Sequence, residues 1–262
     1  MEGVFLQLCY MSYINSLYTI NKHKKEKAML KVEGLIKAYG NEMILKDLNF
    51  QIKENQMVGL LGPNGSGKTT LLKIINGLVE ATSGKILFND KEPNIDMKKH
   101  VAYLPERSFL STEQTVIESI HYFRDFFEDF KMDKVSKLLE LFEIDAKKRL
   151  STLSKGQKGK VMLALTFARD ADLYILDEPL DGVDPASREF ILKVMLKYKK
   201  PNSTILISTH LIADIEDYLD YCLILKKGEL IESDTKDHLT KKYNKTINNI
   251  FKAVFSHDEK II

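Results

Sequence analysis

The chain contains little cysteine. Its 262 residues include two, Cys9 and Cys222, which form neither a Cys-x-x-Cys pair nor a spacing typical of a metal site. Its six histidines are scattered along the sequence, and they show no ligand spacing either. Because disulfides rarely persist in a reducing compartment, two isolated cysteines favour a protein of the cytoplasm.

The chain also lacks a long hydrophobic run. No stretch reaches about 18 nearly uninterrupted apolar residues, the length that predicts a membrane-spanning helix. The nearest approach, residues 3–20, is interrupted by four polar residues, and no basic residue precedes it, so it makes a poor signal peptide. One interpretation of residues 1–28 is an interfacial helix bordered by the lysine-rich stretch 21–27. We favour an N-terminal extension outside the core, because Met29 directly precedes the first predicted strand.

An excess of charge of either sign is missing too. The 39 Lys and Arg residues nearly balance the 37 Asp and Glu residues, which leaves a formal net charge of +2. Lysine far outnumbers arginine, which disfavours the arginine-based reading of base edges that is typical of sequence-specific DNA binders. We therefore expect no nucleic-acid partner. With 44% hydrophobic and 29% charged residues, the chain can form one large domain or a domain with an inserted subdomain.

A glycine-rich segment fits the phosphate-binding P-loop pattern. It consists of Gly62, Pro63, Asn64, Gly65, Ser66, Gly67, Lys68, Thr69 and Thr70. The apolar run before it predicts a buried strand, and residues 71–76 predict a helix whose N-terminus would face the phosphates. We expect Lys68 to reach the β- and γ-phosphates of ATP, and Thr69 to ligate Mg²⁺. An accidental glycine-rich turn is the alternative, and the surrounding strand and helix disfavour it.

Hydrophobic patterning predicts an α/β fold around this loop. Strand-like segments occur at 30–36, 43–52, 85–89, 100–104, 173–176, 204–208 and 222–225. Helical spacing occurs at 115–130, 135–142 and 185–198. The predicted architecture is a P-loop NTPase core with a mixed sheet, an N-terminal antiparallel β subdomain and an inserted α-helical subdomain at about 106–168. The tail beyond Tyr243 is weakly patterned.

Two further polar groups follow buried strands. Asp177 and Glu178 come directly after the run 173–176, 109 residues after Lys68. A carboxylate there can hold Mg²⁺, and its neighbour can orient the attacking water. His210 ends another apolar run, where a neutral imidazole can hydrogen-bond the γ-phosphate and the water. Surface acids and a structurally satisfied histidine are the alternatives, which the combination with the P-loop disfavours.

The order of these segments resembles the ATP-binding subunit of ATP-binding-cassette (ABC) transporters over residues 30 to about 235. The family's LSGGQ signature is matched by LSKGQ at 153–157, its Walker B segment by 173–177, its D-loop by 181–184 and its switch histidine by His210. The resemblance implies an ABC ATPase domain at 29–240, between the extension 1–28 and a C-terminal tail at 241–262.

The resemblance also implies roles for individual residues. Glu178 would be the catalytic carboxylate, with His210 beside it, and Asp177 and Thr69 would hold Mg²⁺. Tyr39 would stack on adenine, although a tyrosine in a turn can equally be a surface residue. Further nucleotide contacts would come from Ser154, Gly156, Gln157 and Asp184. Ser154 and Gly156 would face ATP bound to a second ATPase subunit, in a homodimer or a heterodimer. A simple helix cap is the alternative for Ser154, and both roles can hold together.

Two residues depart from the family pattern. Lys155 replaces a glycine of the signature and adds a positive charge close to phosphate, which we expect to be tolerated. Glu106, in Tyr103-Leu-Pro-Glu106, stands where the family has a glutamine. Glu106 would ligate Mg²⁺ with a charged oxygen, and we hypothesise that it links the nucleotide state to a membrane partner. A surface acid in a loop is the alternative.

The leading functional prediction is an ATP-hydrolysing subunit at the cytoplasmic face of the membrane, which powers transport through separate membrane-spanning subunits. The short helical insertion, the YLPE segment and the aromatic-rich helix after it resemble exporters of drugs, antibiotics or peptides. One alternative is a soluble ABC-type ATPase acting on ribosomes or DNA, although such chains usually carry two cassettes or a long coiled coil. A P-loop phosphotransferase is a second alternative, but it would not need LSKGQ. The cargo and the choice between homodimer and heterodimer stay open.

Overall fold

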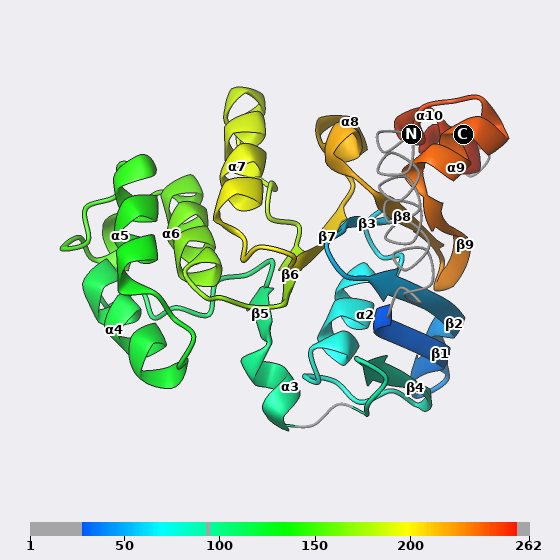
Figure 1. Ribbon diagram of the computed structural model, residues 1–262, viewed down its shortest axis with the longest axis horizontal. Helices are drawn as coiled ribbons and strands as arrows, with labels where there is room; N and C mark the ends of the chain where they lie inside the picture. The colour runs from blue at the N-terminus through cyan, green and yellow to red at the C-terminus, as the bar shows by residue number, and fades with distance from the viewer. Residues whose placement is uncertain (1–27, 93–94, 256–262) are drawn as a thin grey trace, which may run out of the picture.

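A computed structural model describes residues 28–92 and 95–255 (Figure 1). The predicted extension 1–28 thus lies outside the described residues except for Ala28, and so does the end of the predicted tail, 256–262. None of the helices in the described residues combines the length and the apolar composition that a membrane span requires. The described chain forms two sheets and a set of helices that carry the polar segments discussed above.

The larger sheet has six strands in the order β5-β6-β7-β3-β8-β9. Their bounds are β5 Val101–Leu104, β6 Leu173–Asp177, β7 Thr204–Thr209, β3 Met57–Leu61, β8 Tyr221–Lys226 and β9 Glu229–Thr235. The first five are parallel, and β9 pairs antiparallel with β8. Every residue of β3, β6 and β7 is buried, as expected for parallel strands that are covered on both faces. The predicted mixed sheet is confirmed, although the sequence patterning missed β9.

The smaller sheet is antiparallel and has the order β2-β1-β4. Its strands are β1 Ala28–Tyr39, β2 Glu42–Lys53 and β4 Ser83–Phe88. One hydrophobic cluster joins their inner faces to α2, Lys68–Ile75, and to the central sheet, and it includes Leu30, Leu71 and Leu223. The antiparallel β subdomain predicted for the N-terminal part is therefore present, and it packs over the helix that follows the P-loop (Figure 1).

Three helices form the inserted subdomain at one end of the molecule (Figure 1). They are α4 Val116–Phe126, α5 Met132–Leu141 and α6 Lys155–Phe167. A capping box of Thr115 and Glu118 starts α4. The predicted helix 115–130 is too long, because the backbone turns extended at Phe127. Phe130 is nevertheless buried, since the chain folds back toward the end of α6 and the backbone of Phe130 pairs with that of Arg169, just after this helix.

The remaining helices cover the sheet and its edges. They are α3 Ile95–Lys99, α7 Pro185–Tyr198, α8 Ile212–Ile215, α9 Lys236–Tyr243 and α10 Ile247–Phe255, with 3₁₀ turns at Leu150–Thr152 and Glu216–Tyr218. The sequence interpretation found α7 but missed α10, which lies in the weakly patterned tail. Ile247 and Ile250 of α10 are buried in the main core, so this part of the tail packs against the domain.

Arg169 joins the helical subdomain to the central sheet. Its guanidinium donates to the Val101 carbonyl at 2.7 Å and to the Lys99 carbonyl at 2.8 Å, next to edge strand β5. It also donates to the Asp129 carboxylate at 2.9 Å, and it lies 3.9 Å from the centre of the Phe127 ring. Arg169 is almost fully buried, and its side chain hydrogen-bonds groups from both subdomains.

Replacing Arg169 with methionine removes the cation that pairs with Asp129 and the donor to two backbone carbonyls. We expect Arg169→Met to lower the free energy of unfolding by about 3 kcal/mol, measured by urea denaturation. Arg124→Met is the control, because Arg124 lies on the surface of α4 and pairs there with its exposed neighbour Asp125. Equal destabilisation by the two variants would contradict this assignment.

Candidate nucleotide-binding and catalytic site

The P-loop connects β3 to α2, and its glycines are required by its backbone. Gly65 and Gly67 have φ angles of 78° and 106°, which other residues rarely adopt. A Cβ atom on Gly62 would lie 2.5 Å from the Ser66 hydroxyl and 2.6 Å from the Leu225 carbonyl oxygen. The loop is therefore tightly wound, and α2 begins at Lys68, directly after it.

The Lys68 ammonium lies across the P-loop. It donates to the carbonyl oxygens of Gly62 at 2.8 Å and Pro63 at 3.2 Å, and it lies 3.1 Å from the Glu178 carboxylate. The side chain is only 5% exposed, so these oxygens compensate a charge that burial would otherwise disfavour. Strands β3 and β6 thus bring together two groups that are 110 positions apart.

Asp177 is the last residue of β6, and only one of its carboxylate oxygens accepts hydrogen bonds from the described residues. The hydroxyls of Thr69 and Ser208 donate to its Oδ1, at 3.2 and 2.7 Å. Its buried Oδ2 has no hydrogen-bond partner among the described residues. A free carboxylate oxygen beside a threonine hydroxyl is a donor set that suits Mg²⁺, so the residues fit the predicted ion.

Glu178 follows with a left-handed backbone, at a φ of 49°. Its N–H donates to the hydroxyl of Ser208 at 3.0 Å and to the Ser208 carbonyl at 3.2 Å, which holds this conformation. The Nδ1 atom of His210 lies 3.0 Å from Glu178 Oε2, opposite the oxygen that faces Lys68. The carboxylate is therefore fixed between an ammonium and an imidazole at the edge of the sheet.

Most of these groups line one cleft of about 610 Å³, whereas Asp177 borders the cleft next to it. Nine of the predicted site residues border it: Asn64, Gly65, Gly67, Lys68, Thr69, Thr70, Glu106, Glu178 and His210. Glu42, Ile44 and Asp181 complete the lining. Tyr39 is not part of this lining. It is exposed at the end of β1, with the Lys37 ammonium 4.6 Å from its ring centre.

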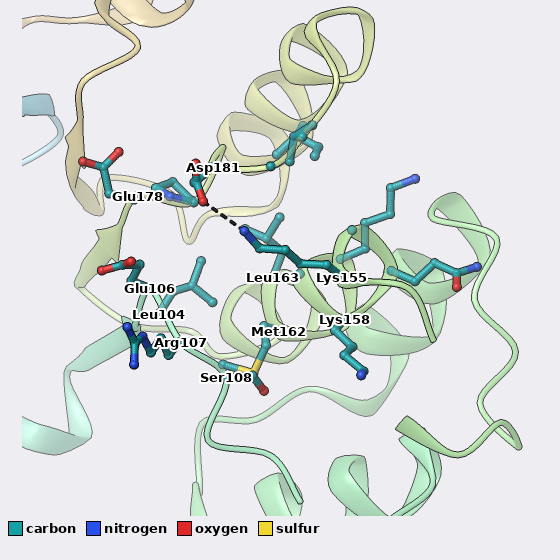
Figure 2. Close-up of a pocket in the computed structure, with 18 of the residues that line it drawn as sticks. Leu104, Glu106, Arg107, Ser108, Lys155, Lys158, Met162, Leu163, Glu178 and Asp181 are labelled. Carbon is teal, nitrogen blue, oxygen red and sulfur yellow. Dashed lines mark hydrogen bonds and ion pairs between the residues drawn. The ribbon is translucent and has the colours of Figure 1, made fainter. Parts of the chain in front are cut away.

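A second cleft, of about 430 Å³, is bordered by the start of α6 and the segment after Glu178 (Figure 2). Ser154 and Gln157 line it and form the capping box of α6. The Gln157 N–H donates to Ser154 Oγ at 3.2 Å, and the Ser154 N–H donates to Gln157 Oε1 at 3.0 Å. The helix-cap interpretation of Ser154 is therefore confirmed. Next to it, a Cβ on Gly156 would meet nothing within 4 Å, so the backbone there is open to the cleft.

Asp184 caps α7 at the border of the second cleft. Its carboxylate accepts from the Ser187 N–H at 3.0 Å, and the hydrogen bonds from Ser187 lower the pKa of Asp184. The two clefts share Glu106, Glu178 and Asp181 in their linings. The signature residues nevertheless border only the second cleft. Within one chain, the signature loop therefore does not face the P-loop.

Sequence reasoning missed one residue of this site, Ser208, and assigned no role to Tyr103, which lines a third cavity beside it. Ser208 orients both acids, and its only sequence signal was its position near the end of a buried strand before His210. The Tyr103 hydroxyl is buried without a hydrogen-bond partner among the described residues. Burial raises the pKa of Tyr103, and the charges of Asp177 and Glu106 raise it further. The phenol thus stays neutral beside the acidic groups.

A family model described as "ABC transporter" matches residues 45–181, about half of the chain. This chain belongs to the ABC transporter family. The ABC-type transporter ATP-binding protein EcsA of Bacillus subtilis is 34% identical over 224 residues, which cover 82% of this chain and 91% of that protein. The manganese transport system ATP-binding protein MntB of the same organism is 31% identical over 222 residues, 80% of this chain and 88% of that one.

A solved structure titled as the ATP-binding subunit of an ABC transporter superposes on this ABC protein with a TM-score of 0.77. The two chains are 29% identical, and the match covers 85% of this chain and 98% of the solved one. The predicted fold class is thereby confirmed. The protein is an ABC ATP-binding subunit that binds and hydrolyses ATP. ATP-binding subunits of this family pair with transmembrane subunits.

Removing the Ser208 hydroxyl leaves Asp177 Oδ1 with a single donor and weakens the support of the Glu178 backbone. We expect Ser208→Ala to lower kcat for ATP about tenfold, with a much smaller change in KM, in a phosphate-release assay. Ser233→Ala is the control, because its hydroxyl bonds Tyr221 on the distant β8–β9 pair. An unchanged kcat in Ser208→Ala would show that the hydroxyl does not position the acids.

Proposed function

We propose that this ABC subunit hydrolyses Mg-ATP in a dimer, in which the signature loop of each chain completes the nucleotide cleft of the other. Hydrolysis then drives export, of a drug, an antibiotic or a peptide, through separate membrane-spanning subunits at the cytoplasmic face of the membrane. The observation that carries the dimer is the separation of the two clefts within one chain. The relatives quoted above are named as transporter proteins, which favours transport over action on ribosomes or DNA.

The P-loop cleft, together with Asp177, which accepts a hydrogen bond from Thr69 at its border, contains the groups that ATP hydrolysis needs. Lys68 would exchange its contacts with its own loop and Glu178 for phosphate oxygens, while the N–H groups at the start of α2 face the same anion. Asp177 and Thr69 would hold Mg²⁺, which offsets the negative charge of the phosphates. Glu178 would then be free to orient the attacking water, together with His210.

The charge of the P-loop cleft supports the participation of a second chain in ATP hydrolysis. Its lining carries four carboxylates, those of Glu42, Glu106, Glu178 and Asp181, but the single lysine Lys68. A triphosphate placed there needs further donors. The N-terminus of the 13-residue helix α6 offers open backbone N–H groups and the positive end of a helix dipole. In a head-to-tail dimer, the partner's α6 would bring these donors to the cleft.

A third cavity supports a membrane-spanning partner. It is a groove of about 490 Å³ between the helical subdomain and the core, with the exposed rings of Phe109 and Phe126 at its border. Lys98 and Arg107 add positive charge to its rim. We assign it to a loop of the membrane-spanning subunit that carries apolar and acidic side chains. Such a loop would bury rings that are more than half exposed in this chain.

Glu106 lies between this groove and the nucleotide. Its neighbours Pro105 and Arg107 line the groove, whereas Glu106 lines the nucleotide cleft. A displacement of this segment by the docked subunit would therefore move a carboxylate relative to Mg-ATP. This arrangement supports the hypothesis that Glu106 links the nucleotide state to the membrane partner. For the direction of transport, the support remains the likeness of YLPE and the aromatic helix to exporters.

Glu178→Gln tests catalysis and dimer formation together. Because the amide keeps the shape but cannot act on the water as a carboxylate does, we expect ATP binding to persist while turnover falls at least about 10²-fold. The unhydrolysed nucleotide should trap a dimer, which size-exclusion chromatography with Mg-ATP would detect. Glu189→Gln is the matched control, because Glu189 lies on the surface of α7. A monomer with bound ATP would contradict the dimer, and unchanged turnover would contradict the role of Glu178.

Glu106→Ala tests the link to the membrane partner. The subunit is co-expressed with the membrane protein encoded in a neighbouring reading frame, and ATPase activity is measured with and without that partner. We expect the variant to retain partner binding but to lose stimulation by the partner. Glu113→Ala, an exposed acid in the following loop, should behave like the parent. Equal stimulation of Glu106→Ala and parent would defeat the hypothesis.

A further inference from the structure

Lys155, the signature residue that departs from the family pattern, forms an ion pair across the second cleft. It is the first residue of α6, and its Nζ lies 3.1 Å from Asp181 Oδ2 (Figure 2). Its stem passes over Gly182, where a Cβ would lie 3.1 Å from Nζ and 3.4 Å from Cε. The lysine therefore reaches from the helical subdomain to the turn that follows the catalytic acid.

Asp181 is closely connected to that acid. Its N–H donates to the Glu178 carbonyl at 3.1 Å, so a single turn separates the two carboxylates. Asp181 also lines the P-loop cleft, which Lys155 does not. Without Lys155, the Asp181 charge would add to those of Glu106 and Glu178 at the place where an anionic nucleotide enters.

The ion pair is too exposed to be a source of stability. The side chains of Lys155 and Asp181 are 78% and 48% exposed, and such pairs add little to folding because water and salt screen them. A charge at this position still acts on an anion in the P-loop cleft, because Asp181 lines that cleft and screening by salt becomes strong only beyond about 10 Å at 0.1 M salt. We therefore expect the ion pair to affect the binding of a ligand more than the free energy of folding.

We propose that Lys155 is a positioning residue for ATP, which holds and neutralises Asp181 at the mouth of the nucleotide cleft of its own chain. This proposal rests on the proposed function in one respect, namely that ATP binds in the P-loop cleft. It gives the unusual lysine a role within its own chain. A lysine that acted directly on nucleotide bound to a partner would not depend on Asp181.

The proposal predicts a thermodynamic cycle with a distinctive result. In the full-length chain, the Kd of a non-hydrolysable Mg-ATP analogue is measured for the parent, Lys155→Gln, Asp181→Asn and the double variant. At low salt, we expect Lys155→Gln to raise Kd about threefold, because an uncompensated carboxylate repels the triphosphate. Asp181→Asn should not raise Kd, and the double variant should match Asp181→Asn. The effect of Lys155→Gln should shrink at high ionic strength.

Three further variants make the outcome decisive. Lys155→Arg should keep the parent Kd, since it keeps the charge. Lys158→Gln should have no effect, because this lysine of the same helix points away from Asp181 (Figure 2). Lys68→Ala should abolish binding, which checks the site itself. An unchanged Kd in Lys155→Gln would overturn this proposal alone. So would a rise in Kd on replacing Lys155 that is equally large in the parent and in Asp181→Asn. Retained binding in Lys68→Ala would overturn the assignment of the cleft as well.

Discussion

The ion pair between Lys68 and Glu178 depends on the order of the strands that carry these residues. β3 and β6 both neighbour β7, and all three run parallel, so their carboxyl ends meet at one edge of the sheet. Asp177 is the last residue of β6, and the P-loop, Glu178 and His210 directly follow β3, β6 and β7. A buried lysine then needs oxygen partners, and in this chain its own loop and Glu178 provide them. The rest of the site is arranged around that contact.

The molecule is divided into two parts that meet near this edge. Arg169 secures the helical subdomain to β5, while Lys155 reaches from the same subdomain to Asp181. The contacts of Arg169 are buried and, by our prediction, stabilise the fold, whereas the ion pair of Lys155 is exposed and, in our proposal, acts through charge. Between them lies Glu106, which borders the nucleotide cleft on one side and neighbours the aromatic groove on the other. Motion of the helical subdomain relative to the core would therefore displace Glu106 relative to the bound nucleotide.

Negative charge is the recurring feature of the nucleotide cleft. The carboxylates of its lining outnumber its lysine, and beside it the buried Asp177 Oδ2 has no hydrogen-bond partner within the described part of the chain. Such a site binds a triphosphate only together with cations or donors from elsewhere. Mg²⁺, the start of α6 from a second chain and Lys155 would each meet part of that requirement. The proposed dimer and the proposed role of Lys155 thus follow from the same electrostatic imbalance.

The amino-acid sequence by itself determined the P-loop, the acidic pair, the family and the α/β class, because each depends on short patterns of neighbouring residues. It did not reveal Ser208, whose contacts with both acids exist only because β7 lies beside β6. It did not reveal α10, whose few apolar residues become a core element only when packed. The separation of the signature loop from the P-loop and the pairing of Lys155 with Asp181 were likewise decided by tertiary structure. Contacts between distant segments depend on how the sheet and the helical subdomain are placed, and local patterning carries no information on that placement.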